Sequence, residues 1–405
     1  MKSESHGAPA ADLALRDEIE VNVEKLVAGG DGLARHHGLP VFVARAAPGD
    51  RLRVRVSQRK AGYARGEILE VLEAGEGRRE PPCRHFADCG GCDLQHLRDD
   101  VQVEAKAAAT VETIERLGKI LVPEPRIIAG DAWGYRMRTQ LHSTREREGG
   151  GAEVGYYARG SHRIVPVEEC PVLVPELEIA ARRLPASLGS EPPARIDLAM
   201  GDGGALSVAP AAAGLPHGEV RVRVGEFDYG FDARCFFQGH RGLLPQLVEA
   251  VVGDHGGSEA IDLYAGVGLF ALPLARHYDT VRSVEGDRVA TRYARRNARR
   301  NGVSNLEVTH QAVESWLPAL QSGCDRVVVD PPRTGLSRSV VARVLGARPD
   351  RVTYVSCHPA ALARDLALLS TGYEFESLAL IDLFPQTGHM EAVAQLKARP
   401  SDPRS

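Results

Sequence analysis

The sequence lacks any long apolar stretch. No run approaches the ~20 apolar residues that a membrane-spanning helix needs, and the N-terminal stretch MKSESHGAPAADLALRDE lacks the apolar core of a secretion signal. We therefore expect a cytoplasmic protein that makes no contact with a membrane. Residues 1–14 are expected to form a short disordered tail.

The sequence also lacks an excess of basic charge. Lys and Arg number 50 against 54 Asp and Glu, which gives a net charge of −4. The overall composition therefore does not indicate nucleic-acid binding, but local patches of arginine can bind a polyanion on an acidic protein. Each patch is equally typical of a solvated strand or helix face. The patches are Arg51, Arg53, Arg55, Arg59 and Lys60, and Arg292, Arg295, Arg296, Arg299 and Arg300.

A disulfide framework is excluded by the cysteines, which number seven and are spread unevenly. An odd, uneven set favours metal binding or catalysis. Residues 83–92 read CRHFADCGGC, a C-x5-C-x2-C spacing with glycines inside the turn. Three thiolates this close in sequence suit a tetrahedral sulfur site.

The fourth ligand of such a site must come from elsewhere in the chain. Cys170 is the best candidate, because it is followed by Pro171 and Cys-Pro recurs at iron–sulfur ligands. Zinc sites more often show two CxxC pairs, and radical enzymes show C-x3-C-x2-C, which this chain does not have. Zinc and three buried unligated cysteines remain alternatives at this stage.

The first domain is predicted over residues 15–75. Short runs alternate apolar and polar residues and are separated by Gly-rich and Pro-Gly turns, which predicts about five antiparallel strands in a small barrel of the OB type. Because side chains alternate along a strand, Arg51, Arg53 and Arg55 share one face and suit an RNA backbone. This segment resembles the TRAM domain, a small barrel attached to RNA-modifying enzymes.

The middle of the chain, residues 76–235, predicts a β-rich domain that carries the cysteine cluster. It begins with a helix at 99–118 and continues with short strands near 135–142, 152–157, 196–200 and 220–224. The stretch near 180–193 is rich in proline and small residues and is interpreted as a loop insertion.

From about residue 240 the pattern changes to alternating strands and helices, which predicts a parallel doubly wound sheet. Helices are predicted at 241–252, 268–277, 288–301, 312–320, 338–346 and 359–370. Strands are predicted at 260–264, 281–285, 305–309, 326–329, 352–356, 373–383 and 391–396.

A cofactor loop is indicated by residues 261–268, which read IDLYAGVG. The glycines let the backbone approach a ligand at the start of a helix. Glu285 ends the next strand, where an acid commonly accepts hydrogen bonds from ribose hydroxyls. With no GxGxxG motif and no phosphate-binding lysine, the pattern favours S-adenosylmethionine over a nucleotide triphosphate. The alternative is an ordinary strand and turn with a surface glutamate.

The candidate chemistry lies after two later strands. Asp330 follows VVV and is itself followed by Pro-Pro-Arg, and Cys357 ends the strand VTYVS, so both are expected over one crevice at the sheet edge. A helix starting at Pro359 is expected to lower the pKa of the thiol. A thiolate that adds to C6 of uracil makes C5 nucleophilic, and Glu391 is placed to remove the C5 proton. Cys357 alone could equally be a small buried residue.

Taken together, these motifs resemble those of the bacterial RNA uracil-5-methyltransferases, which make 5-methyluridine in ribosomal and transfer RNA. The resemblance rests on the barrel, the cysteine cluster, Phe236-Phe237-Gln238, Asp262–Gly268, Asp330-Pro331-Pro332-Arg333, Ser356-Cys357 and Gly388-His389-Met390-Glu391. One departure is Leu269, which stands where some members carry a polar cofactor contact.

The resemblance implies a site and a domain order. Cys83, Cys89, Cys92 and Cys170 would hold a [4Fe-4S] cluster of structural role, and Gln238, Tyr264, Glu285 and Asp330 would contact S-adenosylmethionine. Cys357 would be the nucleophile and Glu391 the base. The expected segments are a tail (1–14), an RNA-binding barrel (15–75), the central cluster domain (76–235) and a Rossmann-like class I methyltransferase domain (236–405).

The expected activity is methylation of C5 of a flipped-out uridine in RNA by a monomeric enzyme. Family members that act on transfer RNA commonly lack the barrel and the cluster, which favours 23S ribosomal RNA here. The alternatives are methylation of transfer RNA, an inactive RNA-binding assembly factor and a small-molecule methyltransferase.

Overall fold

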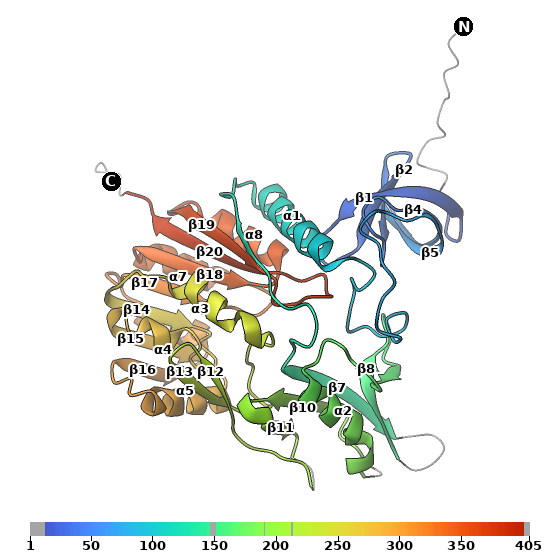
Figure 1. Cartoon of the computed structure of the whole chain (residues 1–405). Helices are drawn as coiled ribbons and strands as arrows, with labels where there is room; N and C mark the ends of the chain where they lie inside the picture. Colours follow the sequence, from blue (N-terminus) through green and yellow to red (C-terminus); the bar gives the residue numbers. More distant parts are fainter. Residues whose placement is uncertain (1–12, 146–150, 190, 212–213, 401–405) are drawn as a thin grey trace. The chain divides into compact units, whose positions relative to one another are not determined.

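The computed structural model describes residues 13–145, 151–189, 191–211 and 214–400 (Figure 1). The predicted tail, except for its last two residues, lies outside these ranges. The chain divides into two compact units. The first comprises Met1–Thr110 with Pro385–His389, and the second comprises Val111–Phe384 with Met390–Ser405. The division falls inside helix α1 (Asp99–Gly118).

The first unit contains a closed five-stranded barrel in the order β1-β2-β3-β5-β4. Alternate residues of each strand point inward, and the interior is filled by residues such as Val21, Val41, Leu52 and Val54, none more than 3% exposed. The predicted barrel is thereby confirmed. Its strands are β1 (Glu18–Leu26), β2 (Gly32–His36), β3 (Leu39–Val43), β4 (Arg51–Lys60) and β5 (Tyr63–Glu73).

The outer face of β4 carries the arginines predicted to share one side of the barrel. Each of them meets a carboxylate from a neighbouring strand, because β4 pairs with both β1 and β5. This face is therefore a ladder of ion pairs in which the cationic charge is balanced. The pairs are Arg51 with Glu73 at 2.6 Å and with Glu20 at 3.2 Å, Arg53 with Glu70 at 2.5 Å, and Arg55 with Glu18 at 3.0 Å.

A short C-terminal segment, Pro385–His389, completes the first unit. The carbonyl of Gln386 accepts hydrogen bonds from the amides of Asp93 (2.8 Å) and Leu94 (3.0 Å). Its side chain accepts a hydrogen bond from the Gln102 side chain and donates to Asp99, and its backbone amide donates to the Gln102 side chain. Gln386 is fully buried and has a φ of 67°, a conformation that non-glycine residues seldom adopt. The residues after the barrel are thus fastened by chain that follows almost at the end of the sequence.

The second unit begins with an antiparallel sheet in the order β11-β10-β7-β8-β9. Helix α2 (Pro175–Ser187) packs on β8 and β10, so the prediction of a loop from about 180 is wrong for residues up to 187. Leu177, Ala181 and Leu184 form a buried stripe, and burial of that stripe outweighs the low helix propensity of Pro185. The strands are β7 (Arg138–Arg145), β8 (Ala152–Tyr157), β9 (Ile164–Pro166), β10 (Arg195–Met200) and β11 (Leu206–Ala209).

A separate hairpin, β12 (Val220–Val224) and β13 (Phe227–Phe231), precedes the large sheet. The side chain of Asn297 bonds both the amide and the carbonyl of Gly230, and Asn301 does the same for Asp228. Both asparagines belong to the end of helix α5 (Arg288–Arg300) or follow it directly. The hairpin is therefore fastened to α5.

The large sheet has eight strands in the order β16-β15-β14-β17-β18-β20-β19-β6. Its first five strands are parallel, as predicted, but β20 runs antiparallel to both β18 and β19. The expectation of a parallel sheet throughout is therefore wrong for the last hairpin. The strands are β14 (Gly257–Leu263), β15 (Tyr278–Glu285), β16 (Leu306–His310), β17 (Arg326–Val329), β18 (Arg351–Ser356), β19 (Tyr373–Ile381), β20 (Glu391–Ala398) and β6 (Arg126–Ile128).

The connecting helices are α3 (Leu244–Val252), α4 (Ala271–Leu274), α5, α6 (Val313–Trp316), α7 (Arg338–Ala347) and α8 (Pro359–Leu369). Those predicted at 268–277 and 312–320 are present but much shorter. The fully buried guanidinium of Arg326 donates to the carbonyls of Val251 and Val252, the last residues of α3, and to Thr353. A cation at a helix C-terminus is favoured by the helix dipole. Within the described residues, no helix combines the length and the apolar character needed to cross a membrane.

Candidate active site

One edge of the large sheet brings together most of the predicted site residues. Glu285 is the last residue of β15, while Tyr264, Asp330 and Cys357 each follow the next strands, β14, β17 and β18. These four strands are parallel neighbours, so their ends lie side by side. Glu391 begins the antiparallel strand β20, whose second residue pairs with the last residue of β18, so it lies at the same edge.

The loop after β14 has the backbone geometry of a ligand site. Tyr264, Gly266 and Gly268 all have positive φ angles, of 64°, 55° and 91°, and strained backbone of this kind clusters at binding sites. The carboxylate of Glu285 accepts a hydrogen bond from the Gly266 amide at 2.8 Å. No heavy atom lies within 4 Å of the position that a side chain on Gly266 would occupy. The loop is therefore both fixed and open to an incoming molecule.

Several buried polar atoms near this edge have no hydrogen-bond partner within the described residues. They are both carboxylate oxygens of Asp262 and the hydroxyl of Ser283; the side-chain carbonyl of Gln238, in the chain after β13, is a further unpartnered atom of the described residues. Asp262 and Ser283 face each other in the register of β14 and β15. Burial raises the pKa of Asp262 well above its usual value, and Asp330 and Glu285 add to the effect. Unsatisfied buried groups are costly, and a polar ligand would satisfy them.

The thiol of Cys357 is half-buried, and its pKa is raised to about 11. Burial is the main cause, Glu391 adds to it, and Arg333 opposes it. The expectation that the start of α8 lowers the pKa of this thiol is therefore wrong. Helix α8 does begin two residues later, with His358 as its N-cap, but loss of water and the nearby carboxyl groups have the larger effect.

Two carboxyl groups act on the thiol, the half-buried Asp330 and the buried Glu391. Burial raises the pKa of Asp330 to about 7. It raises the pKa of Glu391 well above its usual value, with a further contribution from Asp330 and an opposing one from Arg333. The negative charge of Asp330 thus disfavours ionisation of Glu391. Arg333 is a cation that acts on both Cys357 and Glu391.

Arg333 was not assigned a role from the sequence, although the signal was present in its place directly after Asp330-Pro331-Pro332. The loop that carries it is held down by α8. Asp365 accepts hydrogen bonds from the Leu336 amide and the Tyr354 hydroxyl, both at 2.7 Å, and Arg364 donates to the carbonyls of Thr334 and Leu336 at 3.0 Å.

The four cysteines predicted to hold a cluster are divided between the units. Cys83, Cys89 and Cys92 belong to the first unit and Cys170 to the second. All seven cysteines lie in the described ranges, and none forms a disulfide. In the same ranges no group of three or more His, Cys, Asp or Glu is arranged to hold a metal ion. The Gly91 amide donates to the Cys89 sulfur at 3.3 Å, a type of hydrogen bond that tunes iron–sulfur sites.

Comparison with known proteins now bears on this geometry. A TRAM domain model matches residues 14–69, and a model described as tRNA (Uracil-5-)-methyltransferase matches residues 217–399. The 23S rRNA (uracil(1939)-C(5))-methyltransferase RlmD of Enterobacter sp. (strain 638) is 34% identical over 420 residues, which cover 93% of this chain and 96% of that protein. The protein of the same name from Salmonella typhi gives the same identity and coverage.

Among solved structures, that of Pyrococcus abyssi tRNA (uracil-54, C5)-methyltransferase in complex with S-adenosyl-L-homocysteine is similar in fold. The TM-score is 0.70 at 24% identity, over 93% of this chain and all of that one. The expectation of a methyltransferase fold with an N-terminal barrel is thereby confirmed. Because relatives at this identity match almost the whole chain, the protein belongs to the family of S-adenosylmethionine-dependent RNA (uracil-5-)-methyltransferases.

Proposed function

We propose that the protein methylates C5 of a uridine in 23S ribosomal RNA. The observation that carries the proposal is the pairing, at one sheet edge, of a thiol after β18 with a carboxyl at the start of β20, beside the cofactor loop after β14. A thiol and a base are the two groups that methylation at C5 of uracil needs and that methylation of an amine does not. The names of the curated relatives support 23S RNA as the substrate.

Cys357 is the proposed nucleophile. Its thiolate forms a bond to C6 of the uracil, and the electron pair released into the ring makes C5 nucleophilic. S-adenosylmethionine supplies the methyl group. Glu391 then takes the proton from C5, and the bond between sulfur and C6 breaks as the double bond re-forms. Arg333 stabilises the thiolate, since it is the cation that lowers the pKa of Cys357. The target base must leave its stack to reach this edge.

The proposed cofactor contacts are Gln238, Tyr264, Glu285 and Asp330. Glu285 lies at the end of β15 and already holds the glycine loop, a position suited to ribose hydroxyls. Gln238 is buried and its side-chain carbonyl has no partner within the described residues, so it is free to accept from a ligand. Leu269 is buried and apolar, so its side chain offers no polar contact.

We further propose that Cys83, Cys89, Cys92 and Cys170 hold a [4Fe-4S] cluster in the central domain, residues 76–235. The donor set fits, since it consists of thiols alone with Cys-Pro at the fourth position and an amide donating to one sulfur. Anaerobic purification followed by iron and zinc analysis tests the assignment. Four irons that fall with Cys170→Ser support it, and stoichiometric zinc contradicts it.

The activity is tested by nucleoside mass spectrometry of 23S ribosomal and transfer RNA from cells with and without the gene. Loss of 5-methyluridine from a 23S fragment is the expected result. Complementation with Cys357→Ser should fail. Cys324→Ala should restore the nucleoside, because it removes a buried thiol that precedes β17, at the other end of that strand from Asp330. Loss from transfer RNA alone would move the substrate to tRNA, the class named by the matching family model.

The role of Glu391 is tested with purified protein. If Glu391 removes the C5 proton, Glu391→Gln should stall after methyl transfer and leave RNA covalently attached to the protein. The adduct is visible as a denaturation-resistant shift on a gel. Release of methylated RNA by Glu391→Gln at the wild-type rate would contradict the assigned base. A protein that changes neither RNA in cells would favour the non-catalytic alternative.

A further inference from the structure

Helix α5 presents a stripe of arginines to solvent. Arg288, Arg292, Arg295 and Arg299 are all exposed, and they follow one another at spacings of four, three and four residues. These spacings place all four on one side of the helix, along about 16 Å of its length. The opposite side is buried and carries Ala290, Tyr293, Ala294 and Asn297. The stripe is therefore a continuous cationic surface.

This positive charge is not balanced by carboxylates. Helix α5 contains no acidic residue, and its N-cap Asp287 is engaged with the Ala290 amide. Within the described residues, no ion pair reaches any of the four stripe arginines; Arg295 donates to the carbonyl of Val308 at 3.0 Å. The barrel strand β4 shows the opposite case, since each of its three outer arginines meets a glutamate. The stripe on α5 thus differs from the three outer arginines of β4, because its arginines form no ion pair with a carboxylate among the described residues.

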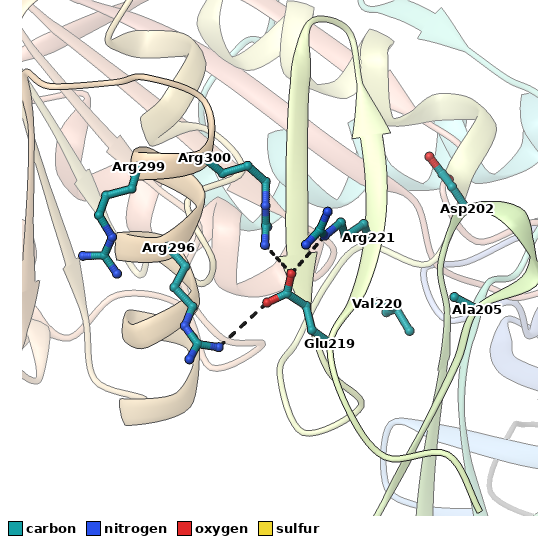
Figure 2. Close-up of a pocket in the computed structure, with 8 residues that line it drawn as sticks. All are labelled: Asp202, Ala205, Glu219, Val220, Arg221, Arg296, Arg299 and Arg300. Atoms are coloured by element: carbon teal, nitrogen blue, oxygen red, sulfur yellow. Dashed lines mark hydrogen bonds and ion pairs between the residues drawn. The ribbon is translucent and has the colours of Figure 1, made fainter.

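A neighbouring cleft of about 900 Å³ does not share this property (Figure 2). Glu219 lines the cleft and forms ion pairs with the guanidinium groups of Arg300, Arg221 and Arg296. Arg299 also lines the cleft, but Figure 2 shows its guanidinium directed away from Glu219. Three of the four arginines that line the cleft are thus already partnered by a carboxylate. An anion would meet uncompensated charge on the stripe rather than in the cleft.

Like charges at these spacings on a helix repel one another. The helix tolerates them because it is held elsewhere, by its Asp287 cap and by Asn297, which is fully buried and bonds Gly230 and Val267. This repulsion does not stabilise the helix. A polyanion lying on the stripe would relieve it.

The stripe also begins at the active edge. Glu285 ends β15 there, and α5 starts three residues later. The helix then runs back along the sheet against β15 and β16, with Arg295 beside the edge strand β16. Nucleic acid whose target base occupies the edge could therefore continue along α5.

We propose that Arg288, Arg292, Arg295 and Arg299 form a binding surface for the sugar-phosphate backbone of the substrate RNA. The surface positions RNA and does not read its sequence, since it offers charge along a line and no pocket for a base. This inference rests on the proposed action on RNA. It assigns the phosphate contact to α5, because the three outer arginines of β4 are already paired with glutamates.

The test uses the full-length protein with Arg292, Arg295 and Arg299 changed together to Gln. Binding to a 23S RNA fragment is measured by filter binding at several salt concentrations. Each lost phosphate contact lowers the slope of log affinity against log salt by about 0.7 to 0.9, so the triple variant should lose about 2 units of slope. Methylation at saturating RNA should keep its kcat while KM rises, because the stripe touches no reacting atom.

Two further variants keep the test sharp. Replacing the same three arginines by Lys preserves the charge and should preserve the slope, which separates charge from any fault in folding. Arg276→Gln, which removes an exposed arginine already paired with Glu226 at 3.2 Å, should change the slope little.

Three results would overturn the inference. The first is a triple Gln variant with the wild-type salt slope. The second is a slope that falls equally in the Lys variant. The third is a loss of binding to polyglutamate but not to RNA, which would assign the stripe to an acidic protein. If the wild-type protein binds RNA with the stripe-dependent slope but methylates none, the proposed function fails while the binding surface stands.

Discussion

At Cys357, the protein places a thiol where three influences compete. Burial and the Glu391 carboxyl favour the protonated thiol, and Arg333 favours the thiolate. In the ligand-free protein burial and the Glu391 carboxyl have the larger effect, so the Cys357 thiol stays protonated at neutral pH. Sequence position alone suggested the reverse, because it shows the helix that follows Cys357 but not the carboxyl on β20, which comes from 34 residues further on in the chain.

The pH dependence of thiol reactivity tests this balance. Because the pKa of Cys357 is about 11, its alkylation by iodoacetamide should rise roughly tenfold per pH unit from pH 7 towards 10. Glu391→Gln removes the negative neighbour and should speed alkylation at pH 8. The reaction is followed by mass spectrometry of the Cys357 peptide, with Arg333→Gln as the variant expected to react more slowly. Equal pH profiles in wild type and Glu391→Gln would contradict this account.

The same shift affects stability. The ordinary pKa of a thiol is 9.0, so the unfolded chain gives up this proton near pH 9 while the folded protein keeps it up to about pH 11. Across that window the unfolded state binds fewer protons than the folded state. Since stability falls with pH wherever the unfolded state binds fewer protons, this thiol lowers the free energy of unfolding as pH rises from 9 to 11.

At the scale of elements, the loop carrying Arg333 is shaped by the helix beneath it. Gly335 has a φ of 76°, and a side chain there would come within 2.5 Å of the Asp365 carboxylate. Asp365 is itself fully buried. The loop therefore depends on one carboxylate that bonds both the Leu336 amide and the Tyr354 hydroxyl.

Asp365→Ala should release this loop. It leaves the Leu336 amide and the Tyr354 hydroxyl without their acceptor, which costs about 1–3 kcal/mol for each buried group. We expect a lower urea midpoint and a strongly reduced single-turnover methylation rate. Tyr354→Phe is the matched control, because it removes one bond but leaves Asp365 on Leu336. It should lose about 1 kcal/mol of stability and keep its rate. A control that loses the rate as fully as Asp365→Ala would argue against the loop as the cause.

Local patterns predicted the barrel and the five parallel strands well, because alternation in β1 and the runs VVV and VTYVS are signals within single elements. Local patterns failed where the direction or the formation of an element depends on the elements that it packs against. Nothing within Glu391–Ala398 states that it inserts antiparallel between β18 and β19. Helix α2 contains Pro185, and its existence depends on the sheet beneath Leu177 and Leu184. Of the predicted site residues, Tyr264, Glu285, Asp330, Cys357 and Glu391 lie at strand ends, where the edge geometry is general, and their roles stay predictions.

At the scale of the whole molecule, Gln386 connects distant parts of the sequence within the first unit. Its side-chain carbonyl accepts a hydrogen bond from the side-chain amide of Gln102, 284 residues away, at 2.9 Å, and its backbone amide donates to the side-chain carbonyl of Gln102 at 3.0 Å. Its backbone carbonyl accepts from two further amides. The segment between the barrel and α1, which carries Cys83, Cys89 and Cys92, is thus completed by Pro385–His389.

Gln386→Gly should weaken this contact without adding backbone strain, since glycine tolerates the positive φ at this position. We expect faster hydrogen exchange of the Asp93 and Leu94 amides and a stability loss of about 2 kcal/mol, as the Gln102 and Asp99 side chains lose their bonds to the Gln386 side chain. Gln102→Ala removes the bond between the two side chains and also the acceptor of the Gln386 backbone amide. If the contact acts as a unit, the two changes together should cost less than their sum. Unchanged exchange at both amides would rule out the contact as the fastening of this segment.

The position of Gln386 has a consequence for synthesis on the ribosome. Domains generally fold as they emerge, N-terminal first, at about 5–20 residues per second. Here the first unit emerges early, yet the residue that fastens it is translated 284 residues after Gln102, which is a delay of about 15–60 s. During that interval the segment that carries the three cysteines after the barrel lacks its contact with Gln386. Translation of Pro385–His389 is then the event that completes the first unit.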